Sequence, residues 1–118
     1  MTDLLMQTWE NYTASWREGT VDQQRALFAA ALSTDCVYRD PLGMASGWDE
    51  LAAYIANFHI QVPGGHFVTR KFASHHQRCM AQWNMLNRQG EVIGEGYSFG
   101  QYNATGKLTS MTGFYEVA

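Results

Sequence analysis

Asp40 is the carboxylate of this chain whose position best suits proton transfer. It ends a strand-like run at residues 36–39 and stands directly before Pro41. Proline disfavours a helical conformation in the residue before it, so Asp40 is expected to be extended. A carboxylate at the end of a strand can face a cavity and act as a general base. The structural alternative is a turn, since Asp-Pro is a common turn dipeptide.

Tyr12 is a candidate hydroxyl donor on the first expected helix. Four side chains recur there at helical spacing: Leu5, Trp9, Tyr12 and Trp16. Such a stripe is typical of a face that packs into a core, where a buried tyrosine hydroxyl finds a partner. Alternatively, Tyr12 points its hydroxyl into a pocket shared with Asp40. The spacing agrees with both interpretations.

The sequence indicates neither a metal site nor a cofactor site. His75 and His76 are adjacent, and neighbouring strand residues face opposite ways, so the pair is not expected to bind metal together. His76 remains a candidate second proton carrier, because histidine titrates near neutral pH. No phosphate-binding or dinucleotide-binding glycine motif and no nucleophile elbow is present. We therefore expect no cofactor.

The composition predicts one globular domain over residues 1–118. The chain is 46% hydrophobic and 16% charged, which excludes disorder, and no apolar run is long enough for a membrane span. A net charge of −3 argues against nucleic acid or an anionic membrane as a partner. Two distant cysteines and no visible secretory signal predict a cytoplasmic protein. Residues 51–90 contain no acid and all four histidines, so this segment could attract an acidic ligand or partner.

The order of periodic segments predicts an α+β fold. The first helix should start with a cap at Thr2 and stop near Gly19, and the second should start with a capping box of Thr20 and Gln23. A third helix should open in the same style at Ser46 and end before residues 63–65. Alternation with a period of two then predicts strands at 66–73, 78–87, 91–102 and 107–117. Helices followed by antiparallel strands favour a curved sheet with helices on one face.

The strand expected at 91–102 has two unlike faces. One face carries small residues, namely Gly94, Gly96, Ser98 and Gly100, and the other carries Ile93, Tyr97 and Phe99. A glycine face marks a bend, or a place where another group approaches the backbone closely. The aromatic face could form a dimer surface or pack under the helices.

These features, in this order, resemble the nuclear transport factor 2-like superfamily, which includes ketosteroid isomerases and SnoaL-like polyketide cyclases. The resemblance covers nearly the whole chain and rests on the segments 11–19, 38–43, 63–67, 103–108 and 113–114, with Gly47 opening the third helix. It implies a cone-like, curved mixed or antiparallel sheet wrapped around three N-terminal helices, with a pocket between them. It also implies that the run at 36–39 is an edge strand and that the protein is a homodimer formed through the sheet.

The resemblance also assigns roles to individual residues. Tyr12 matches the tyrosine that donates to a developing oxyanion, and Asp40 matches the aspartate that moves the proton. Ser98 stands where many relatives have a second, protonated carboxyl group, so its hydroxyl becomes the second expected donor. We expect an aromatic wall around them: Trp16, Tyr38, Phe58, Trp83 and Phe114.

Two functions follow from this assignment. The first is an isomerase, cyclase or dehydratase that moves a proton on an apolar, carbonyl-bearing substrate. The second is a module without catalytic activity that binds a small apolar or aromatic ligand or serves dimerisation. Fold alone does not choose between them.

Overall fold

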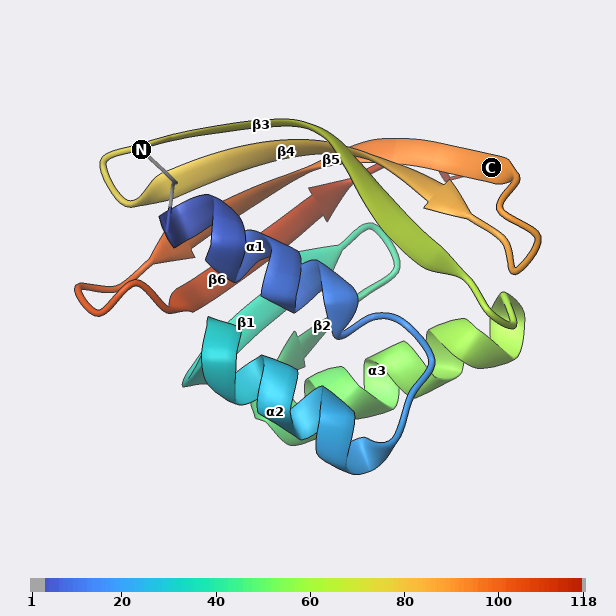
Figure 1. Ribbon diagram of the computed structural model, residues 1–118, viewed down its shortest axis with the longest axis horizontal. Coiled ribbons are helices and arrows are strands. Elements are labelled where there is room, and N and C mark those ends of the chain that lie inside the picture. The colour runs from blue at the N-terminus through green and yellow to red at the C-terminus, as the bar shows by residue number, and fades with distance from the viewer. Residues whose placement is uncertain (1–3, 118) are drawn as a thin grey trace.

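The computed structural model describes residues 4–117 and contains three helices and six strands (Figure 1). The helices are α1 (Leu4–Ala14), α2 (Val21–Ala31) and α3 (Gly47–Gln61). The strands are β1 (Leu32–Asp40), β2 (Gly43–Ser46), β3 (His66–His75), β4 (Arg78–Leu86), β5 (Val92–Tyr102) and β6 (Leu108–Phe114). The predicted α+β class is confirmed.

All six strands form one mixed sheet in the order β2-β1-β6-β5-β4-β3. The neighbours β1 and β6 are parallel, and the other four neighbouring pairs are antiparallel. The register shifts within four of the five strand pairs, and such irregularities bend a sheet. Figure 1 shows the sheet arching over the helices, which all lie on its inner side. This is the curved sheet with three helices that the resemblance implied.

The edge of the sheet differs from the expectation. The run at 36–39 belongs to the longer strand β1, which pairs on both sides, so the prediction that it forms an edge is wrong. The edge strand next to β1 is β2, which folds back on β1 through a tight turn at Asp40 to Gly43, and β3 forms the other edge. A strand of four residues was not visible in the sequence because its last residue, Ser46, also reads as a helix start.

Of the helix caps expected at Thr20 and Ser46, only the one at Thr20 forms as predicted. Thr20 and Gln23 form the capping box, with Thr20 Oγ1 accepting from the Gln23 amide at 3.1 Å and Gln23 Oε1 accepting from the Thr20 amide at 2.9 Å. At the start of α3 the Ser46 side chain makes no cap hydrogen bond. Instead the Ser46 amide donates to Glu50 Oε1 at 2.8 Å. The cap expected at Thr2 lies outside the described residues.

The core lies between the helices and the inner face of the sheet. Trp9 and Tyr12 of α1 and Trp16, just beyond the end of α1, are all at most 5% exposed. The glycines of strand β5 face inward, and aromatic rings lie against two of them. A Cβ on Gly96 would meet the Trp83 ring at 2.6 Å, and one on Gly100 would lie 3.3 Å from the Trp9 ring.

The opposite face of β5 points away from the helices. Ile93, Tyr97 and Phe99 are each 47% exposed, so the alternative that this face packs under the helices is wrong. The described helices reach at most 15 residues, and none of them is long and apolar enough to span a bilayer.

Candidate functional site

A cavity of about 480 Å³ opens between α3, the β1–β2 turn, the strands β3 to β5 and the segment after β6. We call it the outer cavity. Its volume is in the range of small-molecule sites. Seven aromatic side chains line it, namely Trp16, Tyr38, Tyr54, Phe58, Phe67, Trp83 and Tyr115. Asp40 lines the same cavity, together with the exposed residues Glu95 and Glu116.

The Asp40 carboxylate is held by both backbone and side-chain donors. Oδ1 accepts the backbone amides of Leu42 at 2.8 Å and Gly43 at 3.1 Å, which fixes the turn between β1 and β2. Oδ1 also accepts the Tyr54 hydroxyl, and Oδ2 accepts the Tyr38 hydroxyl, both at 2.6 Å. A carboxylate has about four acceptor positions. Oδ2 carries one of these four hydrogen bonds, and the Tyr115 hydroxyl is a further hydrogen-bond partner of the carboxylate.

The tyrosines around Asp40 remain protonated well above neutral pH. Burial is the main cause that raises the pKa of Tyr38 and of Tyr54 far above the usual range, and the hydrogen bond to Asp40 adds to it. Burial and the Asp40 charge raise the pKa of Tyr115 to about 12. Three neutral phenols next to one carboxylate therefore supply hydroxyl groups that donate hydrogen bonds.

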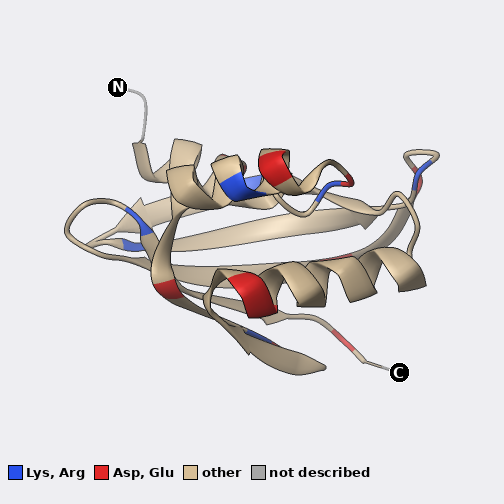
Figure 2. Ribbon diagram, turned by 90° about the horizontal axis from the view of Figure 1, so that it is seen from below, with Lys and Arg blue, Asp and Glu red and all other residues tan. Residues whose placement is uncertain are grey.

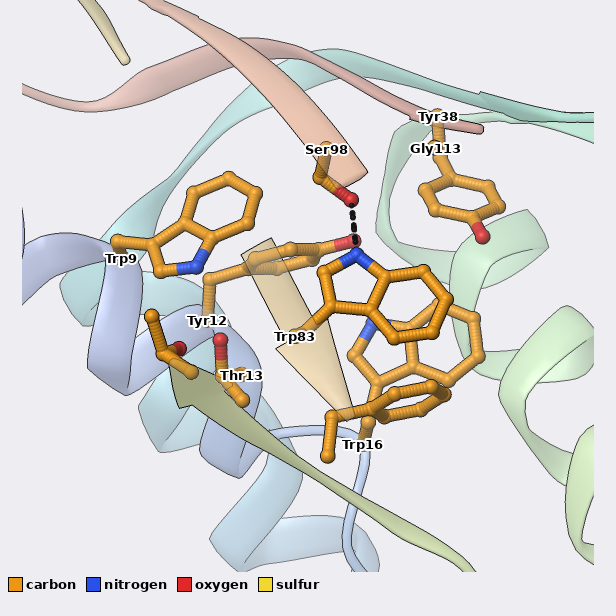
Figure 3. Close-up of a pocket in the computed structure, with 10 residues that line it drawn as sticks. Trp9, Tyr12, Thr13, Trp16, Tyr38, Trp83, Ser98 and Gly113 are labelled. Carbon is orange, nitrogen blue, oxygen red and sulfur yellow. Dashed lines mark hydrogen bonds between the residues drawn. The ribbon is translucent and has the colours of Figure 1, made fainter. Parts of the chain in front are cut away.

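Tyr12 and Ser98 line a second, smaller cavity of about 40 Å³, the inner chamber (Figure 3). This volume admits a few water molecules at most. Ser98 Oγ accepts the indole hydrogen of Trp83 at 2.9 Å. Burial is the main cause that raises the pKa of Tyr12 above its usual range, and the Trp16 side chain partly opposes the shift through a hydrogen bond.

Four rings separate the two cavities, since Trp16, Tyr38, Phe67 and Trp83 line both of them. Tyr12 and Ser98 do not line the outer cavity, and Asp40 does not line the inner chamber. The pocket that the sequence analysis assigned to Tyr12, Asp40 and Ser98 is thus divided. Tyr38 connects its two parts, because it lines both cavities and donates to Asp40.

The remaining predicted site residues fall into two groups. Trp16, Tyr38, Phe58 and Trp83 line the outer cavity. Phe114 lines neither cavity: it is 55% exposed and packs against Phe99 on the outer face of the sheet. Placing Phe114 in the wall was wrong because strand alternation turns its neighbours, Gly113 and Tyr115, toward the cavities instead.

His76 also lies away from both cavities. It is exposed in the β3–β4 turn, where its φ of 50° and that of Gln77, 60°, reverse the chain. The positive φ also brings His75 Nδ1 and His76 Nδ1 to 3.0 Å, so the two rings do not face opposite ways as predicted. His76 is therefore too remote to carry a proton at Asp40.

Three aromatic residues of the site were missed. Tyr54 was within reach of the pattern, because it stands three residues after Leu51 and four before Phe58 on the third helix. Tyr115 depended on the register of a strand that ends one residue earlier. Phe67 was noted only as part of a segment, and its side chain stacks on Phe58 with ring centroids 5.3 Å apart.

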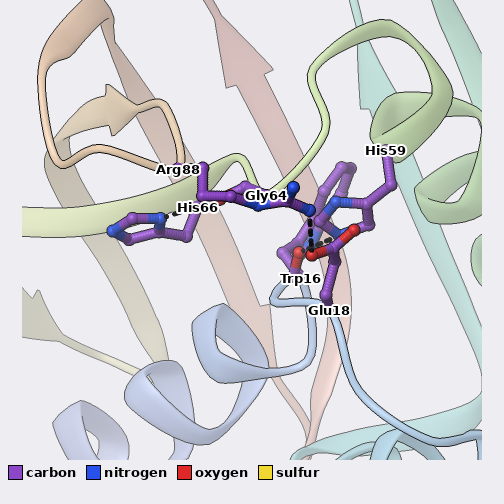
Figure 4. Close-up of polar contacts among 6 residues, drawn as sticks. All are labelled: Trp16, Glu18, His59, Gly64, His66 and Arg88. Atoms are coloured by element: carbon purple, nitrogen blue, oxygen red, sulfur yellow. Dashed lines mark hydrogen bonds and ion pairs between the residues drawn. The ribbon is translucent and has the colours of Figure 1, made fainter.

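Two polar contacts lie next to Trp16, one between His59 and Trp16 and one between Arg88 and Glu18, and we call them the polar clasp (Figure 4). His59 Nε2 donates to the Trp16 carbonyl oxygen at 2.7 Å, which ties the loop after α1 to α3. Arg88 donates to Glu18 at 2.9 Å. This hydrogen bond is the main cause that lowers the pKa of Glu18. The clasp joins three distant segments on one side of the cavity.

Comparison with known proteins decides the family. The family model of the SnoaL-like domain matches residues 9–117 of this sequence, which is nearly the whole chain. The protein belongs to the SnoaL-like family. A candidate isomerase of this family from Agrobacterium tumefaciens has a TM-score of 0.87 at 23% identity, covering 97% of this chain and 98% of that one. No curated protein matches the sequence.

Other solved structures show the same fold at lower identity. TerC, crystallised with polyporic acid, has a TM-score of 0.78 at 14% identity, covering 97% of this chain and 92% of TerC. A candidate SnoaL-like polyketide cyclase from a Jannaschia species has a TM-score of 0.75 at 10% identity, with 96% and 85% covered. The SnoaL-like fold is consistent with an isomerase or a cyclase.

Proposed function

We propose that this SnoaL-like protein is an enzyme of the isomerase or cyclase type, and that Asp40 moves a proton on a small apolar molecule that carries a carbonyl group. One observation carries the proposal. The Asp40 carboxylate stands on the wall of an aromatic cavity with tyrosine hydroxyls on both oxygens. No Lys, Arg or His lines that cavity, and no described residue forms an ion pair with Asp40.

The chemistry begins at Asp40 Oδ2, which removes a proton from the carbon next to the substrate carbonyl. The electron pair of that C–H bond moves onto the carbonyl oxygen and forms an enolate. A tyrosine hydroxyl from the Asp40 cluster, that of Tyr54 or Tyr115, turns to donate to this oxygen. General bases contribute about 10² to 10⁴ in rate, and an oxyanion donor contributes a comparable factor.

The enolate then has two outcomes. In an isomerisation, Asp40 returns the proton to a different carbon of the substrate. In an aldol-type cyclisation, the enolate carbon attacks a second carbonyl of the same molecule, and the proton ends on the new alkoxide. Both outcomes leave Asp40 ionised again, so one carboxylate is sufficient for either of them.

Binding without chemistry is the second candidate, and one observation favours it. Asp40 Oδ1 also accepts two backbone amides of the β1–β2 turn, which by itself gives the residue a structural role. TerC was crystallised with polyporic acid, and we propose that the outer cavity likewise takes a small organic ligand.

A test with β-tetralone, a bicyclic ketone with acidic C–H bonds beside its carbonyl, separates the two candidates. The protein is incubated with β-tetralone in D2O, and loss of the proton signals is followed by NMR. The enzyme proposal predicts saturable exchange well above the rate in buffer. Saturable binding in calorimetry with exchange at the buffer rate would support a binding module instead.

We also propose that the protein is a homodimer through the outer face of the sheet and works in a reducing compartment such as the cytoplasm. Tyr97, Phe99 and Phe114 place large, half-exposed rings side by side on that face. Cys36 and Cys79 are both buried and form no disulfide with each other, which fits a reducing compartment.

A further inference from the structure

The charges that line the outer cavity all have one sign. Asp40, Glu95 and Glu116 are its three charged residues. All eight Lys and Arg and all four His are described, yet none of them lines either cavity. The bases of the acid-free segment 51–90 therefore do not provide an attractive charge for an acidic ligand in either cavity. Figure 2 shows that charged residues are sparse along the chain. Three carboxylates at one cavity are therefore a local cluster of negative charge.

No described residue neutralises these carboxylates. The ion pairs among residues 4–117 are Arg25 with Asp49 and Arg88 with Glu18, and both lie outside the cavity. Glu95 and Glu116 are exposed, so they stand at the mouth, while Asp40 is half-buried behind them. A cleft lined by one sign of charge repels ligands of that sign and concentrates the opposite sign.

The hydrogen bonds at the inner end of the cavity have the same preference. Tyr38 and Tyr54 both give their hydroxyl hydrogens to Asp40. Their oxygens and Asp40 Oδ2 are left with lone pairs. Before a substrate reacts, this part of the wall can therefore accept hydrogen bonds from a ligand. A carboxylate or a phosphate brings only acceptors, so it finds no free donor in this arrangement.

The rings of the outer cavity complete a site for a cation. Trp83 and Tyr115, with centroids 6.1 Å apart, stand on the side of the wall that β4 and the segment after β6 provide. Aromatic faces attract ammonium groups, and tryptophan and tyrosine attract them more strongly than phenylalanine. In such a site the carboxylates interact with the charge of an organic cation, and the aromatic rings contact its apolar part.

We propose that the substrate of this site is an organic amine, protonated at neutral pH and carried on an apolar or aromatic body. Its ammonium group lies against Glu95 and Glu116 at the mouth, and its carbonyl end faces Asp40. This inference rests on the proposed function, since it names the class of molecule on which Asp40 acts. Anionic substrates, such as free carboxylic acids and phosphate esters, are excluded by the same charges.

Three probes with the same bicyclic body test this proposal by calorimetry: naphthylethylammonium, naphthylethanol and naphthylacetate. We expect the ammonium to bind about tenfold more tightly than the alcohol, and the acetate to bind most weakly. The Glu95→Gln/Glu116→Gln double variant should reduce the preference for the ammonium over the alcohol to about twofold. Salt at about 1 M should reduce it in the wild type too, because exposed charges are screened.

The control is Asp22→Asn/Asp35→Asn, which removes two exposed acids that line neither cavity and should keep the full preference. Equal affinity for the three probes, no detectable binding of the ammonium, or an unchanged preference in the Glu95/Glu116 variant would overturn the proposal. β-Tetralone has no charge, so its exchange tests Asp40 independently. Exchange without an ammonium preference would contradict the cation site alone.

Discussion

Asp40 has a structural role in the fold, and in the proposed reaction it also moves the proton. Oδ1 closes the β1–β2 turn, and Oδ2 accepts the Tyr38 hydroxyl. The sequence could predict the position of Asp40, because Pro41 restricts it to an extended conformation before a turn. It also placed Tyr38 in the aromatic wall. It could not predict that Tyr38, Tyr54 and Tyr115 meet at this carboxylate, because they come from β1, α3 and the segment after β6, and only the folded chain brings them together.

The raised pKa values of these tyrosines predict how stability depends on alkaline pH. The folded protein keeps the Tyr115 proton up to a pKa of about 12, whereas an unfolded tyrosine releases it from about pH 10. Between these values the folded state binds more protons, so the free energy of unfolding is retained below about pH 10 and falls as the pH rises. Tyr12, Tyr38 and Tyr54 shift in the same direction.

Urea unfolding over a pH series measures this slope, and ultraviolet absorbance of tyrosinate measures the titration. Tyr115→Phe should make the slope between about pH 10 and 12 less steep, because it removes one of the protons. A free energy of unfolding that stays constant through this range would contradict the assignment of these phenols to a buried cluster.

At the scale of elements, strand β5 explains how the aromatic wall fits against the sheet. The sequence indicated a glycine face, and the structure assigns it to the inner side, where it accommodates the rings of Trp83 and Trp9. Period-two alternation located the long strands well. It missed β2, whose four residues are too few for a pattern and whose pairing depends on the turn at Asp40.

Gly96→Ala tests this close packing. A Cβ there would lie 2.6 Å from the Trp83 ring and 2.6 Å from the Phe114 carbonyl oxygen. Because the backbone atom cannot swing away, we expect a loss of about 1–3 kcal/mol in the free energy of unfolding. Chemical denaturation monitored by tryptophan fluorescence measures it.

Gly94→Ala is the matched control on the same face of β5. Its nearest neighbour is the terminal methyl carbon of Met85 at 3.2 Å, which can move at little cost, so its effect should be clearly smaller. Equal losses in the two variants would show that strand propensity, and not the Trp83 ring, sets the requirement for glycine.

At the scale of the whole molecule, the sheet has two unlike faces. The inner face is covered by the helices and holds both cavities, while the outer face leaves Tyr97, Phe99 and Phe114 half exposed. Composition and periodicity could predict this layering. They could not predict that the cone contains two cavities, because that depends on how four aromatic rings pack against one another.

If the outer face joins two copies, the protein should elute with twice the monomer mass in light scattering after gel filtration. Phe99→Glu/Phe114→Glu should shift it to a monomer, because it places charges on a surface that the dimer buries. Val21→Glu/Ile60→Glu changes two residues that are 74% and 77% exposed on the helices and should leave the mass unchanged. A wild-type monomer at high concentration would contradict the dimer.

The central claim is that Asp40 moves a proton, and Asp40→Asn tests it most directly. Asparagine keeps an oxygen for the two turn amides, so the variant should fold with a melting temperature close to that of the wild type, whereas Asp40→Ala should lose stability as well. The measurement is the rate of β-tetralone exchange in D2O at saturation. We predict that Asp40→Asn lowers this rate by at least about 10² while binding of β-tetralone changes little. Exchange at the wild-type rate in the folded variant would contradict the account.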